Sequence, residues 1–176
     1  MSIRTRSGDK GYTKLIKAGS LKKDSHEFVA LGDIDELIAY LGLISIRLKN
    51  KDSKDIAGKL RQLVSDIASS VALNIDGGTA SGKFTGKNVR WIEEILEKME
   101  NSLPARTGFY YPGKNELSAY IDITRAVARR AERSVVGLYH KSDNKNPHIL
   151  KFMNSVSDLL FLMMLREDRK KAGGSK

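Results

Sequence analysis

Five stretches of the chain repeat apolar residues every three or four positions, which is the spacing of an amphipathic helix. These stretches are residues 25–48, 53–73, 88–101, 116–140 and 148–169. The segments between them are rich in Gly, Ser, Asn and Pro, which favour turns. No stretch alternates apolar and polar residues convincingly enough for a half-buried strand. The pattern therefore predicts an all-α, up-down five-helix bundle without significant sheet.

The segments outside the predicted helices differ from one another in composition. Residues 1–24 are basic and contain Gly8 and Gly11, which let a backbone curve and present N–H groups to an anion. Residues 74–86 form a long Gly-rich loop, and residues 170–176 a basic tail. We expect one domain over residues 1–176, with a flexible Gly-rich segment over about the first 24 residues and a frayed tail.

The charge of the chain favours anionic partners. Its 176 residues include 31 Lys and Arg against 21 Asp and Glu, a net charge of +10, so nucleic acid and nucleotide phosphate are both candidates. The absence of Cys excludes disulfides and thiolate metal sites, and the three scattered His argue against a His metal site. No run of 18 apolar residues and no apolar N-terminal signal region is present, so we expect a cytoplasmic protein without a membrane span.

The predicted helix 116–140 concentrates positive charge. Its four clustered arginines are Arg125, Arg129, Arg130 and Arg133. One stripe of the helix is made by Asp122, Arg125, Arg129 and Glu132. Two interpretations remain open from these residues alone. The stripe is either a solvated face that pairs with its own acids, or an anion site, because guanidinium groups bind phosphate oxygens bidentately.

Two further positions place polar groups among apolar ones. Asp35 falls beside Ile34 and Ile38, so it needs a partner such as an arginine of helix 116–140, unless it stays wet at the edge of the apolar face. Asn154 and Asp158 are four positions apart in the most apolar helix and are expected to form a buried polar notch. Because buried polar groups need partners, the arginine stripe is again the candidate.

Three consecutive aromatic residues, Phe109 to Tyr111, stand between Gly108 and Pro112. Glycine and proline exclude a regular helix there. The aromatic rings either plug one end of the bundle or stack on a flat ligand, and composition alone does not decide between these roles.

Taken together, five segments resemble the cobalamin adenosyltransferase family, in its trimeric form with a ferritin-like left-handed bundle of five helices. They occur in the family's order, and they are Thr5–Thr13, Gly32–Leu37, Phe109–Gly113, Thr124–Arg133 and Asn154–Phe161. The chain departs from the family's usual residues at Asp33, Lys114 and Ser155. The resemblance implies transfer of the 5′-deoxyadenosyl group of ATP to the cobalt of cob(I)alamin.

The resemblance also implies roles for individual residues. The segment that orders over the triphosphate contains Thr5, Arg6, Gly8, Asp9, Gly11 and Thr13. Lys23, or alternatively Lys22, is similar to the family's phosphate lysine. The nucleotide is contacted by Arg129 and Glu132, Asn154 helps to hold it, and Arg130 and Arg133 are close by. Asp35 and Arg125 resemble the family's salt bridge across the subunit interface, and Phe109 resembles the aromatic that displaces the lower axial ligand of the corrinoid.

The same resemblance implies the partners. ATP is the co-substrate with Mg²⁺, the corrinoid is cob(I)alamin made from cob(II)alamin, and no metal ligand is expected from the protein. A homotrimer with active sites at the subunit interfaces is expected, together with a reductase and an adenosylcobalamin-dependent enzyme as further partners.

The alternatives are a basic helical module that binds nucleic acid or other polyanions, and a purely structural bundle. The first has only the charge in its favour, since no recognition motif is present. The second leaves the Gly-rich N-terminus and the Asn154–Asp158 pair unexplained.

Overall fold

The computed structural model of the chain describes residues 8–15, 19–75, 84–104, 108, 110–141 and 146–170. Within these ranges the chain forms two short strands, β1 (Tyr12–Leu15) and β2 (Gly19–Lys22), and five helices. The helices are α1 (His26–Arg47), α2 (Lys51–Ile75), α3 (Gly86–Ser102), α4 (Glu116–His140) and α5 (Pro147–Asp168). The five-helix bundle that the sequence predicts is confirmed.

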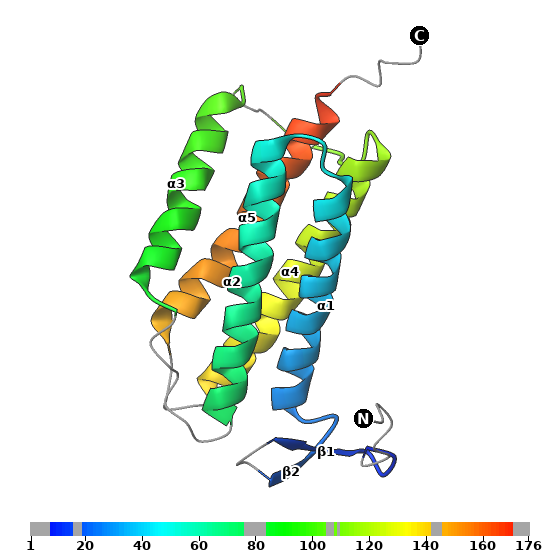
Figure 1. Cartoon of the computed structure of the whole chain (residues 1–176), viewed down its shortest axis with the longest axis vertical. Helices are drawn as coiled ribbons and strands as arrows, with labels where there is room; N and C mark the ends of the chain where they lie inside the picture. Colours follow the sequence, from blue (N-terminus) through cyan, green and yellow to red (C-terminus); the bar gives the residue numbers. More distant parts are fainter. Residues whose placement is uncertain are drawn as a thin grey trace.

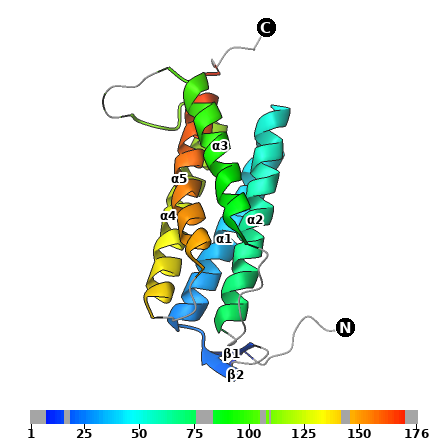
Figure 2. The same cartoon turned by 90° about the vertical axis from the view of Figure 1, so that its left-hand side faces the viewer.

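Successive helices run in opposite directions along the bundle (Figure 1). Helix α1 packs against α2 and α4, and α5 packs against α4 and α3. The β1–β2 hairpin lies beyond the end of the bundle where α1 begins, in both views (Figures 1 and 2). The start of α4 lies at the opposite end. The hairpin and the residues that lead into α4 are therefore separated by the length of the bundle.

The helix boundaries follow local capping signals, and the predicted bounds are confirmed to within two residues at either end. Asn115 caps α4, since its side chain accepts a hydrogen bond from Ser118 N–H and its own N–H donates to Ser118 Oγ. Thr85 caps α3 in the same reciprocal way with Asn88. Such caps satisfy N–H groups that a helix leaves unpaired at its start.

Helix α5 supplies much of the core. Eleven of its residues are buried, among them Phe152, which meets Phe84 edge to face with ring centroids 5.1 Å apart. Among the described helices α5 alone is long and apolar enough to cross a membrane, with a mean hydropathy of 1.3, and 56% of that stretch is buried. A core helix of a globular bundle meets the same criterion, and the packing against α3 and α4 gives α5 that role.

The hairpin is the element that the sequence analysis did not anticipate. Strands β1 and β2 pair antiparallel, with Tyr12 opposite Lys22 and Leu15 opposite Gly19. Gly11 and Gly19 have φ values of +76° and +74°, which glycine adopts without strain. The strands have only four residues each, and their described side chains are exposed or half-buried, so they lack the alternation that marks a strand in sequence.

Candidate functional site

The hairpin brings the glycine-rich N-terminal segment against one of the two candidate phosphate lysines. Lys23 N–H donates to the Gly11 carbonyl at 2.9 Å, and Gly11 N–H donates to the Gly8 carbonyl at 3.2 Å. A Cβ added to Gly8 would come within 2.7 Å of Lys23 Nζ, so only glycine lets this ammonium group approach the backbone so closely. Of Lys22 and Lys23, it is Lys23 that lies against Gly8.

Only some of the other residues predicted to bind the triphosphate lie within the described ranges. Asp9 is exposed and Thr13, in β1, is half-buried. Thr5, Arg6 and Phe109 lie outside the described residues.

Two arginines of α4 are open to solvent. Arg129 and Arg133 are exposed and form no ion pair with any residue in the described ranges. Arg125 instead pairs with Asp122 on its own helix, with Nε 2.7 Å from Oδ1. The self-paired interpretation of the stripe therefore applies to Arg125, whereas Arg129 and Arg133 stay available to an anion.

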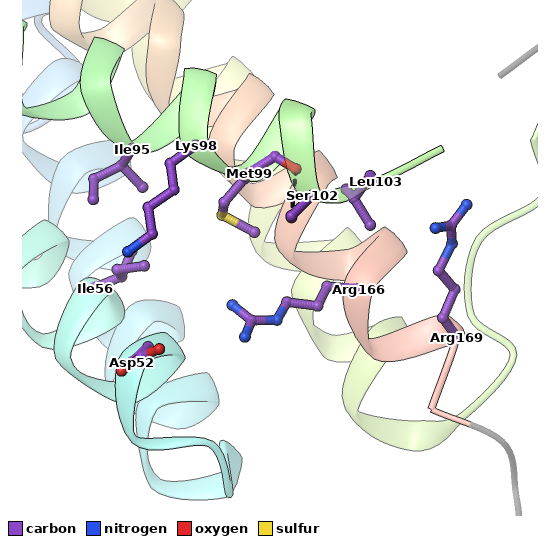
Figure 3. Close-up of a pocket in the computed structure, with 9 residues that line it drawn as sticks. All are labelled: Asp52, Ile56, Ile95, Lys98, Met99, Ser102, Leu103, Arg166 and Arg169. Carbon is purple, nitrogen blue, oxygen red and sulfur yellow. Dashed lines mark hydrogen bonds between the residues drawn. The ribbon is translucent and has the colours of Figure 1, made fainter. Parts of the chain in front are cut away.

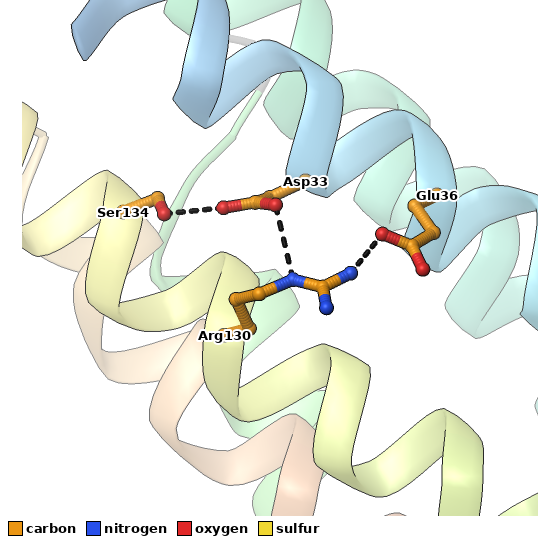
Figure 4. A network of polar contacts seen from close by, with 4 residues as sticks. All are labelled: Asp33, Glu36, Arg130 and Ser134. Atoms are coloured by element: carbon orange, nitrogen blue, oxygen red, sulfur yellow. Dashed lines mark hydrogen bonds and ion pairs between the residues drawn. The ribbon is translucent and has the colours of Figure 1, made fainter.

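Arg130 differs from its neighbour Arg129 because it is bound by two carboxylates of α1. Its Nε lies 3.1 Å from Asp33 Oδ1, and its terminal nitrogen donates to Glu36 (Figure 4). Ser134, one turn further along α4, donates to the second oxygen of Asp33. Asp33 stands at a position where the sequence departs from the family, and no sequence signal pointed to this network. It fixes α4 against α1 at the level of the arginines.

The surroundings of Asp35 decide between the two alternatives that the sequence left open for it. Asp35 is exposed, while Ile34 and Leu37 are fully buried, so it lies outside the apolar face that packs in the core. Its stripe on α1 consists of Gly32, Asp35, Ala39 and Ile46, all of which are exposed. Asp35 forms no ion pair within the described part of the chain. It therefore stands on an open stripe of small and apolar residues.

The prediction of a buried polar notch in α5 is wrong. Asn154 and Asp158 are both exposed, and they share a solvent-facing stripe with Lys151. The residues between them, Val156 and Ser157, are buried. Helix α5 keeps one polar stripe although it is otherwise apolar. The arginines of α4 therefore do not serve as partners of these two residues within the described chain.

Of the two roles considered from sequence for the aromatic segment, Tyr110 takes the first, packing at one end of the bundle. Tyr110 is half-buried and packs on the core, whereas Tyr111 is 80% exposed. The Tyr110 hydroxyl donates to Asp168 at the end of α5, a residue that the sequence analysis did not single out. An acidic residue at a helix end gives no sequence signal of such a contact.

Pockets on the described surface add little to this arrangement. A shallow one of about 200 Å³ lies between α1 and α4 and takes in His26, Arg130 and Arg133. Another, of about 400 Å³, lies between α2, α3 and α5, where Lys98 and Arg166 extend into the space (Figure 3). It contains none of the predicted site residues. Groups of three or more His, Asp or Glu that could hold a metal ion do not occur in the described ranges.

Comparison with known proteins identifies the family. A family profile described as cobalamin adenosyltransferase matches residues 3–167. A cobalamin adenosyltransferase of Cupriavidus metallidurans is 33% identical over 175 residues, covering 98% of this chain and 91% of the relative. A corrinoid adenosyltransferase of Bacillus subtilis is 30% identical, with 92% and 83% covered. The human corrinoid adenosyltransferase MMAB is 29% identical, and the match spans 92% of this chain and 66% of the human protein.

Solved structures agree with the sequence relatives. A PduO-type ATP:corrinoid adenosyltransferase from Lactobacillus reuteri, a phenylalanine-to-alanine variant complexed with cobalamin and ATP, superimposes with a TM-score of 0.85 at 27% identity. The match covers 95% of this chain and 93% of that one. An arginine-to-lysine variant of the same enzyme type, complexed with ATP, gives a TM-score of 0.83 at 28% identity, with 94% of both chains covered. Since the profile spans nearly the whole bundle, including the hairpin and the arginines of α4, the chain belongs to the cobalamin adenosyltransferase family.

Proposed function

We propose that the protein is an ATP:cob(I)alamin adenosyltransferase, which makes adenosylcobalamin and releases triphosphate. The observation that carries this proposal is the family match over residues 3–167, which includes both candidate anion-binding regions. Relatives of the same family were solved with ATP and cobalamin bound, and the chain superimposes on one of them over 95% of its length.

The reaction asks for positioning and charge neutralisation more than for a protein nucleophile. Cobalt(I) donates an electron pair to the 5′ carbon of ATP, so that a cobalt–carbon bond forms and cobalt(I) becomes cobalt(III). The bond from the 5′ carbon to oxygen breaks, and its electron pair leaves with triphosphate. Cob(I)alamin itself is made by one-electron reduction of cob(II)alamin, which requires an external reductant. Cations that face the triphosphate lower the barrier as negative charge develops on the leaving group.

The charges of the chain support an assignment of these roles. Lys23, Gly8 and Gly11 form one group, in which two backbone hydrogen bonds fix the turn and the Lys23 ammonium lies against the backbone of Gly8. An ammonium group held in this way is a point charge that suits a phosphate. Arg129 and Arg133 add guanidinium groups that no described carboxylate neutralises. In this proposal Thr5, Arg6, Asp9 and Thr13 complete the triphosphate site. Glu132 and Asn154 complete the nucleotide site, and Arg130 lies beside it, held by Asp33 and Glu36.

Mg²⁺ fits this arrangement as a companion of ATP. The described residues bring no set of three acidic or His side chains together, and Mg²⁺ commonly takes its ligands from substrate phosphates and water. When bound, it would neutralise part of the triphosphate charge, in addition to the arginines and Lys23.

We further propose that the active form is a homotrimer with active sites between subunits. Two observations support this proposal. The exposed stripe Gly32–Asp35–Ala39–Ile46 is small and apolar apart from its carboxylate, and Ile46 is 74% exposed. Burial of this stripe by a neighbour would leave Asp35 in need of a cation, which the neighbour's arginine would supply. The hairpin and the start of α4 lie at opposite ends of one chain, so one chain alone does not bring them together (Figure 1).

Phe109 in this proposal displaces the lower axial ligand of the corrinoid, and Asp35 and Arg125 pair across the interface. A cytoplasmic location, a reductase that supplies cob(I)alamin and an enzyme that uses adenosylcobalamin belong to the same proposal.

The test is to mix the full chain with ATP, cob(II)alamin and a chemical reductant, and to follow the absorption spectrum. Growth of the adenosylcobalamin spectrum, with one triphosphate released per cobalamin converted, is the expected result. A parallel reaction without ATP measures the background. A spectrum that stays at reduced cobalamin in the presence of ATP contradicts the proposal.

A further inference from the structure

A single carboxylate at the end of α5 holds the segment that leads into α4. Asp168 Oδ2 accepts a hydrogen bond from the Tyr110 hydroxyl at 2.9 Å, and Asp168 Oδ1 accepts one from Lys114 N–H at 2.8 Å. Both oxygens of one side chain are thus used, one for each end of the segment Tyr110–Lys114. The two donors are 58 and 54 positions away from Asp168 in the sequence. We call this arrangement the Asp168 clamp.

Neighbouring contacts fix the same segment further. Gly113, between the two donors, has a φ of +87°, which favours glycine. The Lys114 ammonium lies 4.9 Å from the centre of the Tyr110 ring, within the range of a cation–π contact. Asn115, which caps α4, also donates from its side chain to the Glu167 carbonyl at 3.0 Å. The clamp therefore joins the start of α4 and the end of α5 into one unit.

The position of the clamp gives it a functional meaning. Tyr110 directly follows Phe109 in the sequence, and Phe109 is the residue to which the proposed function assigns the lower face of the corrinoid. A segment that is ordered before the ligand arrives does not have to lose its conformational entropy on binding. We infer that Asp168 is a positioning residue for corrinoid binding, which acts through Tyr110 and Lys114 and does not serve the ATP site. This inference rests on the proposed function.

The separation of the clamp from the ATP residues makes the inference testable. Helix α4 begins at Glu116, and Arg129 is 13 positions further on, about 20 Å along the helix axis at about 1.5 Å per residue. The β1–β2 hairpin, which Lys23 directly follows in the sequence, lies at the other end of the bundle (Figures 1 and 2). Loss of the clamp should therefore weaken corrinoid binding and leave ATP binding unchanged.

The experiment measures KM for cob(II)alamin and KM for ATP, in the coupled reduction and transfer assay, for three variants. Asp168→Ala removes both bonds and is expected to raise the corrinoid KM about tenfold, because hydrogen bonds to a charged group are strong. Tyr110→Phe removes one bond and keeps the ring, so a rise of about threefold is expected. Asp168→Asn keeps an acceptor oxygen and should fall between them. KM for ATP should stay within about twofold throughout.

A spectroscopic readout separates positioning from general destabilisation. The fraction of bound cob(II)alamin whose lower ligand is displaced should fall in the same order, Tyr110→Phe, Asp168→Asn, Asp168→Ala. Asp55→Ala, which removes an exposed carboxylate of α2, is the matched control and should change neither KM nor the spectrum.

Two results overturn the inference while the wild-type chain still transfers adenosyl. One is an unchanged corrinoid KM in Tyr110→Phe and Asp168→Asn. The other is an equal rise of both KM values, which would mark a loss of structure as the cause. A wild-type chain that fails to transfer adenosyl contradicts the proposed function instead, so the two failures are distinguishable.

Discussion

Two edges of α4 carry neighbouring arginines in opposite circumstances. On the closed edge, Arg130 and Ser134 are engaged by Asp33 and Glu36 of α1. On the open edge, Arg129 and Arg133 are exposed and unpaired within the described chain. Arg129 and Arg130 are adjacent in the sequence and have the same chemistry. The difference teaches that the neighbouring helix, and not residue type, decides which arginine stabilises the bundle and which is left for a ligand.

Replacement of Arg129 by alanine is the strongest test of the open edge. We expect transfer to fall by at least about two orders of magnitude, because a bidentate contact of this guanidinium group with ATP would comprise two charge-assisted hydrogen bonds, worth about 1.5–3 kcal/mol each. The melting temperature should not change, because Arg129 contacts no described carboxylate. Steady-state kinetics and thermal unfolding measure the two effects.

The control for this variant is Arg90→Ala, which removes a guanidinium group from α3 that is also exposed. It should behave as wild type in both assays. Turnover of Arg129→Ala close to that of wild type would show that the open edge does not bind the nucleotide.

The second test concerns the surface beside the open edge. Ile46→Asp places a charge on the exposed stripe of α1, and burial of an unpaired carboxylate is costly. We expect assembly to weaken at least about tenfold, with a parallel loss of transfer. Light scattering over a dilution series measures the assembly.

Leu73→Asp is the matched control, since Leu73 is a 43% exposed apolar residue on α2, away from that stripe. If Ile46→Asp assembles and turns over like Leu73→Asp, the stripe is not part of the interface.

The closed edge is tested by Arg130→Ala. Arg130 and Glu36 are more than a third exposed, so solvent screens the pairing and the loss should be only about 1 kcal/mol of unfolding free energy. KM for ATP should rise less than about threefold, well below the effect at Arg129. Chemical denaturation and kinetics on the same preparation make the comparison. A loss of activity as large as that of Arg129→Ala would show that the two edges act together on ATP.

The smallest expected effect is at Tyr139, which lies on the buried face of α4 and not on either edge. Its hydroxyl is buried and has no hydrogen-bond partner among the described residues. An unpaired polar group that no ligand can reach should only cost stability, so Tyr139→Phe is expected to gain about 1 kcal/mol. The gain in unfolding free energy is measured by chemical denaturation. The control is Tyr40→Phe, because Tyr40 is a half-buried tyrosine of α1.

The same residue predicts a pH dependence. Burial raises the pKa of Tyr139 above its usual value of 10.0. The unfolded chain therefore releases the phenolic proton at a lower pH than the folded chain, and stability falls as pH rises above about 10. Tyr139→Phe should lose less stability over that range than wild type. Identical alkaline unfolding of the two proteins would contradict this explanation.

The sequence predicted the helices well because their apolar spacing is a local property. It predicted less well which way single polar residues face. Asn154 was expected against apolar surface and Asp35 either there or wet at its edge, and both are exposed. The width of a buried face depends on which helices pack there, and the local pattern does not contain that information. The hairpin was missed because its strands are too short and too exposed to alternate.

The candidate site was only partly predictable for a related reason. The proximity of Gly8 and Lys23 depends on a hairpin, and the engagement of Arg130 depends on the register of α4 against α1. Asp168 gave no signal at all, because its partners are more than fifty positions away. The family resemblance predicted the reaction, whereas only the structure shows which arginines pair with carboxylates and which do not.

The pairing of α3 with α5 has a consequence for how the chain is made. Helix α3 packs chiefly on α5, which is made after the other four described helices, and the apolar residues Val89, Ile92 and Met99 of α3 are buried only once the two have met. While α4 is being synthesised, this apolar face of α3 stays exposed, because α5 has not yet been made. Nascent chains stalled before residue 147 should therefore recruit chaperones or aggregate, whereas chains released after α5 should not.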